Sequence, residues 1–208
     1  MTKTDKQQEP FKVPSIGVLA IQGDYAAHAD ALTDVGALPS LVKTAEDLRL
    51  DGKSLDGLIL PGGESTTILK FLERRGLFDA LQQFCQSKPV FGTCAGAILL
   101  AREVRNPAQR SLGILDAVVE RNAYGRQIDS SILTEETSLP GGPLEMVFIR
   151  APRIVTTGES VEVLARREGF PILVRQGMTM AATFHPELSA DRRVHKAFVE
   201  TVSQAVNK

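Results

Sequence analysis

The chain has 208 residues, 43% of them hydrophobic and 24% charged, and its 24 basic and 25 acidic side chains give a formal net charge of −1. A chain of this length buries about 70% of its unfolded surface, so it can fold without a disulfide or a structural metal. The balanced charge argues against nucleic acid or an anionic membrane surface as the main partner. With no Trp and only 5% aromatic residues, a platform for stacking single-stranded bases is also excluded.

The N-terminus and the cysteines predict a cytoplasmic protein. Residues 1–14 are expected to form a flexible polar tail, because they lack the apolar stretch of a signal peptide. No apolar run approaches the roughly 18 residues of a membrane span. Two cysteines are too few for a disulfide framework, which indicates a reducing compartment. Residues 15–208 are expected to form one domain.

Short apolar runs alternate with helical patterns in the first half of the chain. Residues 15–21 are almost continuously apolar, as is typical of a strand that is covered on both faces. The pattern continues with a helix at 24–36, a strand at 56–60, helices within 66–86, a strand at 89–92 and a helix at 95–102. Strands that alternate with helices predict βαβ units and a mostly parallel sheet.

The second half contains six short segments rich in Val, Ile and Thr, separated by turn residues. They cover residues 115–122, 127–133, 144–149, 160–167, 170–175 and 178–184. We expect these segments to extend the sheet with antiparallel strands, and we expect a final helix over 191–206. The sequence therefore predicts an α/β fold with a mostly parallel sheet and an antiparallel extension.

A glycine-flanked cysteine follows the strand predicted at 89–92. Gly92 and Gly96 stand two residues on either side of Cys94, which is the spacing of the nucleophile elbow G-x-S-x-G with sulfur in place of oxygen. The N-terminus of the following helix favours a thiolate, and the N–H of Ala95 is placed to bind an oxyanion. The pattern favours a catalytic Cys94, although a buried cysteine in a glycine-rich turn would have the same sequence.

A catalytic thiol needs a base, and the chain has three histidines. His185 directly follows a predicted strand. Residues two apart in an extended segment point to the same side, so Glu187 can accept a hydrogen bond from the His185 ring. Cys94, His185 and Glu187 would then form a triad. The H-x-E pattern of zinc deaminases also fits, but it needs a later P-C-x-x-C and both cysteines precede it, so no metal site is expected.

The other histidines and the other cysteine carry weaker signals. His28 lies on the first predicted helix and His195 on the last, and both are interpreted as surface or packing residues. A role at an interface stays open for His28, because it is close to the turn formed by Gln22 and Gly23. Cys85 lies on the apolar face of a helix and is expected to pack there.

A second glycine-rich turn, residues 61–64 (Pro-Gly-Gly-Glu), follows the strand at 56–60 and opens a helix. Its glycines permit a backbone that faces a ligand, and the helix N-terminus attracts a carboxylate. It lacks the Lys and Ser or Thr of the phosphate-binding loop. The turn could hold the α-amino acid end of a substrate, or it could be an ordinary turn in which Ser65 or Thr66 caps the helix.

The motifs together resemble the class I, triad-type glutamine amidotransferases: Pro61-Gly62-Gly63-Glu64, Gly92-Thr93-Cys94-Ala95-Gly96 and His185-Pro186-Glu187. Narrower segments resemble the glutaminase subunits of pyridoxal 5′-phosphate synthases: Ile21-Gln22-Gly23, Gly62-Gly63-Glu64-Ser65-Thr66, Arg121-Asn122-Ala123-Tyr124-Gly125-Arg126-Gln127 and Phe148-Ile149-Arg150-Ala151-Pro152. The resemblance runs from about residue 16 to the last helix. It implies the three-layer fold of that family, with helices on both faces of the sheet.

The resemblance also implies a reaction. Cys94 would attack the side-chain amide of L-glutamine, His185 would protonate the departing ammonia, and Glu187 would fix the His185 tautomer. The implied substrate-binding residues are Gly62, Gly63, Glu64, Ala95, Arg121, Arg150 and Ala151. The ammonia would pass to a (β/α)₈-barrel synthase subunit that makes pyridoxal 5′-phosphate, and this chain would need no cofactor.

Gln22 and Gly23 are implied to lie near the interface with that subunit. Docking there could order the peptide between Gly62 and Gly63 as an oxyanion donor, so the chain alone would be a poor glutaminase. Two alternatives stay open. One is an amidotransferase or γ-glutamyl hydrolase with another acceptor or substrate. The other is a non-catalytic regulatory subunit, which would usually have lost part of the triad.

Overall fold

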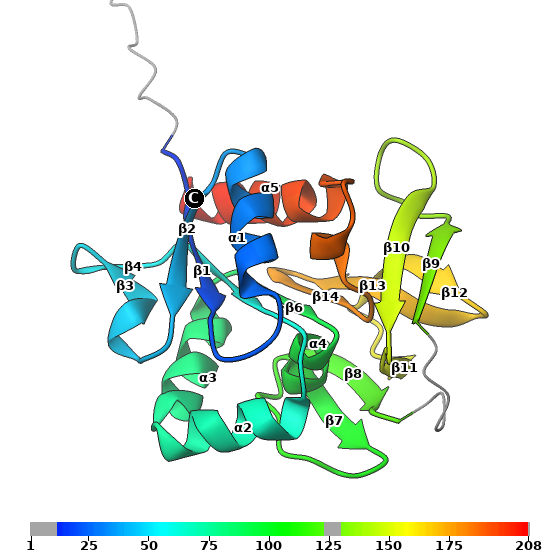
Figure 1. The fold of residues 1–208 in the computed structure, drawn as a ribbon, viewed down its shortest axis with the longest axis horizontal. Helices are drawn as coiled ribbons and strands as arrows, with labels where there is room; N and C mark the ends of the chain where they lie inside the picture. Colours follow the sequence, from blue (N-terminus) through cyan, green and yellow to red (C-terminus); the bar gives the residue numbers. More distant parts are fainter. Residues whose placement is uncertain (1–11, 123–129, 208) are drawn as a thin grey trace, which may run out of the picture.

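The computed structural model describes residues 12–122 and 130–207, with a seven-stranded sheet through the middle of the molecule (Figure 1). In spatial order its strands are β12 (Glu162–Arg167), β13 (Phe170–Gln176), β14 (Thr179–Ala182), β6 (Val90–Thr93), β5 (Gly57–Leu60), β1 (Ser15–Leu19) and β2 (Leu38–Val42). All neighbours from β14 to β2 are parallel, whereas β13 pairs antiparallel with β14 and β12. The predicted mostly parallel sheet with an antiparallel extension is confirmed.

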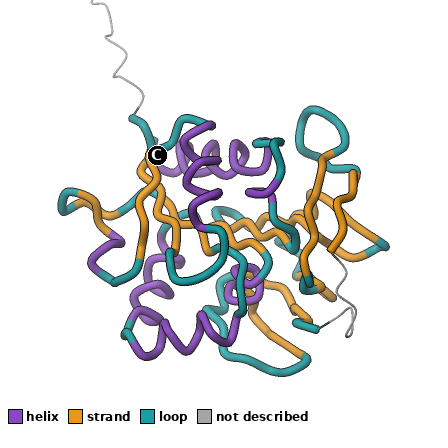
Figure 2. Tube along the Cα trace, viewed as in Figure 1, coloured by secondary structure: helices purple, strands orange, loops and turns teal. Residues whose placement is uncertain are grey.

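Helices cover both faces of this sheet, which gives three layers (Figures 1 and 2). On one side lie α1 (Tyr25–Asp34) and α5 (Arg193–Val206). On the other side lie α2 (Ser65–Arg74), α3 (Leu77–Ser87) and α4 (Ala95–Leu100). Two short 3₁₀ turns complete the helical elements, η1 (Glu46–Leu48) and η2 (Pro186–Leu188). None of the helices in these described parts is long and apolar enough to span a bilayer.

The central strands are apolar because both of their faces are covered. Successive side chains of a strand point to opposite faces. Accordingly, Leu58 and Leu60 on β5 pack into the hydrophobic cluster under α2, α3 and α4, whereas Ile59 packs into the cluster under α1 and α5. All three side chains are almost completely buried. Because both faces of these strands are buried, their sequences are almost continuously apolar.

Several strands form small sheets beside the central one. These are β11 (Arg153–Thr157), β8 (Leu115–Glu120) and β7 (Ala101–Arg105) in one sheet, β10 (Leu144–Ile149) with β9 (Ser130–Glu135), and β3 (Arg49–Leu50) with β4 (Lys53–Ser54). The prediction that all six segments of the second half extend the central sheet is therefore wrong for those that became β8, β9 and β10. In β9 and β10 more and less exposed side chains alternate, as in a hairpin with one solvent-facing side.

One predicted helix also ends earlier than expected, and the strands β2, β3, β4, β7 and β11 were not predicted. The helix predicted to reach residue 102 ends at Leu100, because the chain turns there into β7. The edge strand β2 was not predicted, since Pro39 and its half-exposed neighbours weaken the strand pattern. Residues 127–129 of the strand predicted at 127–133 lie outside the described residues.

Candidate active site

Cys94 lies at a sharp turn between β6 and α4. Its φ of 49° and ψ of −105° are unusual for a residue with a side chain, and its N–H donates to the carbonyl of Ala182 at 2.8 Å. A Cβ on Gly96 would overlap the backbone oxygen of Leu60, and a Cβ on Gly92 would lie 2.6 Å from backbone atoms of Gly96. The flanking glycines therefore allow the close approach of strand and helix that the spacing predicts.

His185 and Glu187 meet as predicted, but in a different local conformation. The His185 N–H donates to the carbonyl of Val147 on β10 at 2.8 Å, and the 3₁₀ turn η2 begins at Pro186. Glu187 is therefore not in an extended segment. The turn nevertheless returns its carboxylate to the ring, with Oε1 2.7 Å from His185 Nδ1. The Glu187 side chain is completely buried, so its orientation is fixed by the protein and not by solvent.

The charge state of His185 follows from its neighbours. Burial of the ring opposes protonation, but hydrogen bonds to Cys94 and Glu187 outweigh it and raise the pKa of His185 to about 10. Gly62 also lies against this pair, since a Cβ at that position would overlap His185 Cε1 and lie 3.4 Å from Cys94 Cβ. The ring is therefore held as a cation next to the thiol at neutral pH, in a space that leaves no room for a side chain at residue 62.

Glu64 caps α2, so neither of the predicted caps, Ser65 and Thr66, is the capping residue. Its carboxylate accepts from the backbone N–H groups of Thr66 at 3.3 Å and Thr67 at 2.7 Å, and from both threonine hydroxyls. Arg121 Nη2 donates to Glu64 Oε1 at 3.1 Å. Burial raises the pKa of Glu64, but the hydrogen bonds from Thr66 and Thr67 outweigh it and lower the pKa to about 2. The carboxylate is a fixed anion that orients Arg121.

The Gln22–Gly23 turn packs directly on the second glycine-rich turn. Gln22 Oε1 accepts a hydrogen bond from the Glu64 N–H at 3.0 Å, and a Cβ on Gly63 would lie 3.2 Å from the same oxygen. Gly63 has a φ of 132°, a backbone conformation that glycine adopts readily. Gln22 is therefore positioned to control the conformation of the loop that carries Gly63.

These elements surround a cleft of about 300 Å³. Its lining residues are Gly23, Gly63, Glu64, Ser65, Cys94, Ile98, Arg121, Asn122, Ile149, Arg150 and His185. Both signs of charge are present, as a zwitterionic ligand requires, and the volume suits a small ligand. No cluster of three or more His, Cys, Asp or Glu that could hold a metal was found within residues 12–122 and 130–207.

The structure brings most of the predicted site residues to this cleft. Gly62 and Ala95 lie directly beside it, the former against His185 and the latter as the buried first residue of α4. Ala151 is buried in the hydrophobic cluster under α1 and α5 and does not line the cleft. Residues 123–127 of the arginine-containing motif lie outside the described residues. The sequence reasoning missed Ile98, which stands one helical turn after Cys94.

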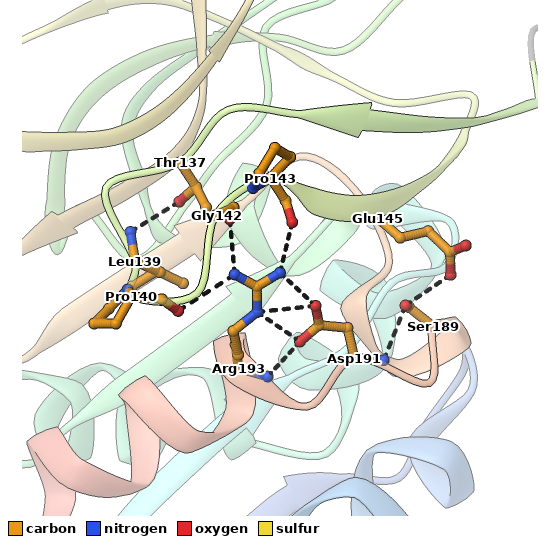
Figure 3. Close-up of polar contacts among 9 residues, drawn as sticks. All are labelled: Thr137, Leu139, Pro140, Gly142, Pro143, Glu145, Ser189, Asp191 and Arg193. Atoms are coloured by element: carbon orange, nitrogen blue, oxygen red, sulfur yellow. Dashed lines mark hydrogen bonds and ion pairs between the residues drawn. The ribbon is translucent and has the colours of Figure 1, made fainter.

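A polar cluster connects β10 and the turn before it to the segment that follows η2 (Figure 3). The Arg193 guanidinium donates to the carbonyls of Gly142 and Pro143, each at 2.7 Å, and pairs with Asp191. Ser189 Oγ donates to Glu145 Oε1 on β10 at 2.8 Å. Because β10 leads to Ile149 and Arg150 and η2 carries Glu187, this cluster fixes two sides of the site relative to each other.

The structure also decides the expectations about the remaining histidines and cysteine. His28 and His195 are completely buried and hydrogen-bonded to each other, so the packing interpretation is confirmed for both and the surface interpretation is wrong. Cys85 packs in the hydrophobic cluster under α2, α3 and α4, as expected. Burial raises the pKa of the Cys85 thiol to about 12, which makes it unreactive.

Known proteins are similar to this chain over most of its length. Residues 18–204 match the SNO glutamine amidotransferase family. The pyridoxal 5′-phosphate synthase subunit PdxT of Koribacter versatilis is 58% identical over 187 residues, which are 90% of this chain and 95% of that protein. The PdxT subunit of Thermotoga neapolitana is 49% identical over 189 residues, which are 90% of this chain and 98% of that protein.

A solved structure of a glutamine amidotransferase is also similar. It has 47% sequence identity and a TM-score of 0.81, and the match covers 90% of this chain and 98% of that one. Sequence and fold thus agree over nearly the full length of the known proteins. The chain belongs to the SNO glutamine amidotransferase family.

Proposed function

We propose that this chain is the glutaminase subunit of a pyridoxal 5′-phosphate synthase. It hydrolyses L-glutamine to L-glutamate and ammonia in the cytoplasm, and a (β/α)₈-barrel synthase subunit takes up the ammonia. The observation that carries the proposal is the meeting of Cys94, His185 and Glu187 beside a charged cleft, in a chain 58% identical to a PdxT subunit. Both parts of this observation are needed. The triad alone would not indicate which substrate is hydrolysed, and membership of the family alone would not indicate that the chain is active.

The substrate binds as a zwitterion. Arg121 and Arg150 attract its α-carboxylate, and Glu64, which lines the same cleft, offers a negative charge to its α-ammonium. Glu64 already accepts hydrogen bonds from Thr66, Thr67 and Arg121. Its contribution is therefore both electrostatic attraction of the ammonium and orientation of Arg121. The side chain of glutamine then extends toward Cys94.

The reaction proceeds through a thioester. The Cys94 thiolate attacks the amide carbon, and backbone N–H groups of Ala95 and Gly63 stabilise the negative charge on the carbonyl oxygen. His185, whose raised pKa of about 10 keeps it protonated, gives its proton to the departing nitrogen as the C–N bond breaks. The neutral His185 then removes a proton from water, which attacks the thioester, and glutamate leaves as the C–S bond breaks.

The partner subunit activates this chemistry through the Gln22–Gly23 turn. Gln22 holds the loop that carries Gly63, so a protein that docks on this turn can change how the Gly63 N–H faces the oxyanion. One oxyanion donor is worth about 10²–10³ in rate. We therefore expect the glutaminase rate to rise by about one to three orders of magnitude when the synthase subunit binds.

The test compares four reactions of the assembled complex: wild type and Cys94→Ala, each with glutamine or with an ammonium salt. Wild type should form pyridoxal 5′-phosphate with either glutamine or an ammonium salt as the nitrogen source. Cys94→Ala should form it with ammonium alone. A Cys94→Ala complex that still used glutamine would refute the nucleophile, and one that failed with ammonium would refute the division of labour between the subunits.

A further inference from the structure

Glu187 has a second carboxylate oxygen that the triad does not use. Oε1 accepts a hydrogen bond from the Nδ1–H of His185, whereas Oε2 is completely buried and lies 3.3 Å from Nε2 of His28. This contact is an ion-pair distance without hydrogen-bond geometry, so Oε2 has no hydrogen-bond partner among the residues that the structure describes. A buried carboxylate oxygen without a donor is costly, so the nearby ring nitrogen matters.

The buried His28, on α1, contacts polar side chains of three other elements: α5, β6 and η2. Its Nε2 also lies 3.1 Å from the hydroxyl of Thr93, the residue before Cys94, and its Nδ1 lies 3.0 Å from Nε2 of His195 on α5. Both histidine side chains are completely buried. The first and the last α-helix of the chain, α1 and α5, thus meet through these two histidines, next to the carboxylate of Glu187.

The position of the hydrogen on His28 follows from what faces each nitrogen. The Thr93 hydroxyl can donate or accept, so it does not decide the tautomer. A carboxylate can only accept, so the nitrogen that faces Glu187 must carry the hydrogen. Nδ1 of His28 then accepts from His195 Nε2. His195 Nδ1, which has no hydrogen-bond partner among the described residues, is then left as an acceptor and not as an orphaned N–H donor.

Burial keeps both rings neutral. It lowers the pKa of His28 well below its usual value, assisted by the positive charges that His195 and His185 can carry, and it lowers the pKa of His195 to about 4. A neutral ring with one fixed hydrogen is a directional donor, whereas a ring that titrated near neutral pH would not be.

We infer that His28 is a positioning residue of the glutaminase: its Nε2–H holds the outer oxygen of Glu187, and His195 fixes the tautomer that makes this possible. The triad is therefore the reactive end of a chain of five side chains, running Cys94, His185, Glu187, His28 and His195. The inference rests on the proposed function, because it assigns His28 a task through Glu187.

The kinetic test uses the glutaminase activity of the assembled complex. His28→Leu removes the donor and should lower kcat about 10- to 100-fold, the usual effect of losing a partner that orients a catalytic ligand. Its KM for glutamine should stay within about threefold, because the cleft residues are unchanged. His28→Gln, whose amide nitrogen can reach the Nε2 position, should recover most of kcat. Leu32→Ala is the matched control, since Leu32 is equally buried on the same helix and its side chain has no hydrogen-bond donor for Glu187.

Three kinetic results would overturn the inference. These are an unchanged kcat in His28→Leu, an equal loss in His28→Leu and His28→Gln, and an equal loss in Leu32→Ala, which would indicate general loosening of α1. Cys94→Ala is run alongside: if it is inactive while His28→Leu is normal, the inference fails and the proposed function stands.

A second measurement uses the wild-type protein, so it does not depend on whether a variant folds. The chain has only three histidines, so ¹⁵N-histidine NMR of the full wild-type chain can report the tautomer of each ring. The inference requires neutral Nε2–H tautomers at His28 and His195 and a protonated ring at His185. An Nδ1–H tautomer or a protonated ring at His28 would overturn it.

Discussion

Gly62→Ala tests the packing of the site, because one methyl group is added directly against the catalytic ring. A Cβ at residue 62 would overlap Cε1 of His185 and lie 3.1 Å from its Nδ1. Gly62 does not have a positive φ, so alanine can adopt the backbone without strain. The imidazole must therefore retreat by about 1 Å to regain the ordinary carbon contact distance of about 3.5 Å.

A displacement of the His185 ring by this distance should lower the catalytic rate. A misplacement of about 1 Å in a catalytic group can lower the rate about 10²-fold, so kcat for glutamine should fall by about that factor while KM changes little. The His185 ring cannot avoid the methyl group easily, since Glu187 holds its Nδ1 at 2.7 Å. The assay is steady-state glutamine hydrolysis by the complex, with thermal unfolding of each variant measured in parallel.

Gly17→Ala is the matched control for overpacking. A Cβ there would lie 2.7 Å from Leu55 and 2.9 Å from Leu58 and Val42, in the core and away from the cleft. Overpacking costs about 1–3 kcal/mol, so Gly17→Ala should lower Tm while kcat per folded molecule stays near that of wild type. A Gly62→Ala variant with normal kcat would refute the steric reasoning.

Three further predictions concern single side chains. A glutamine-analogue electrophile should label Cys94 alone, because burial raises the pKa of Cys85 to about 12, and mass spectrometry showing label on Cys85 would contradict this. Glu64→Ala removes the α2 cap and should cost about 1 kcal/mol at neutral pH. Since the folded-state pKa of Glu64 is lowered from 4.5 to about 2, calorimetry should show this difference shrinking as pH falls from 4.5 toward 2. Gln22→Ala should reduce stimulation by the synthase without changing the circular dichroism spectrum, and full stimulation would refute its role.

The sequence predicts those parts of the structure that depend on residues close together along the chain. Strands buried on both faces, such as β5, leave apolar runs, and the turn around Cys94 needs glycine at two fixed positions. His185 and Glu187 are two residues apart, so their contact could be predicted even though the conformation between them was not. These features depend on neighbours along the chain.

The features that were missed depend on contacts distant in the sequence. His28 and His195 are 167 positions apart, and nothing in either helical segment records that they meet. The assignment of strands to separate sheets also depends on tertiary packing, because a strand pattern does not say which sheet it joins. Glu64 is an intermediate case: a carboxylate at the start of a predicted helix is a possible cap, but its hydrogen bond from Arg121 spans 57 positions.

The central claim is that ammonia released at Cys94 becomes the ring nitrogen of pyridoxal 5′-phosphate. The direct measurement supplies the complex with glutamine labelled with ¹⁵N at the side-chain amide, together with unlabelled ammonium, a pentose phosphate and a triose phosphate, and determines the mass of the product. Wild type should incorporate ¹⁵N, and Cys94→Ala should form only unlabelled product. Unlabelled product from wild type, or equal labelling by both proteins, would contradict the account.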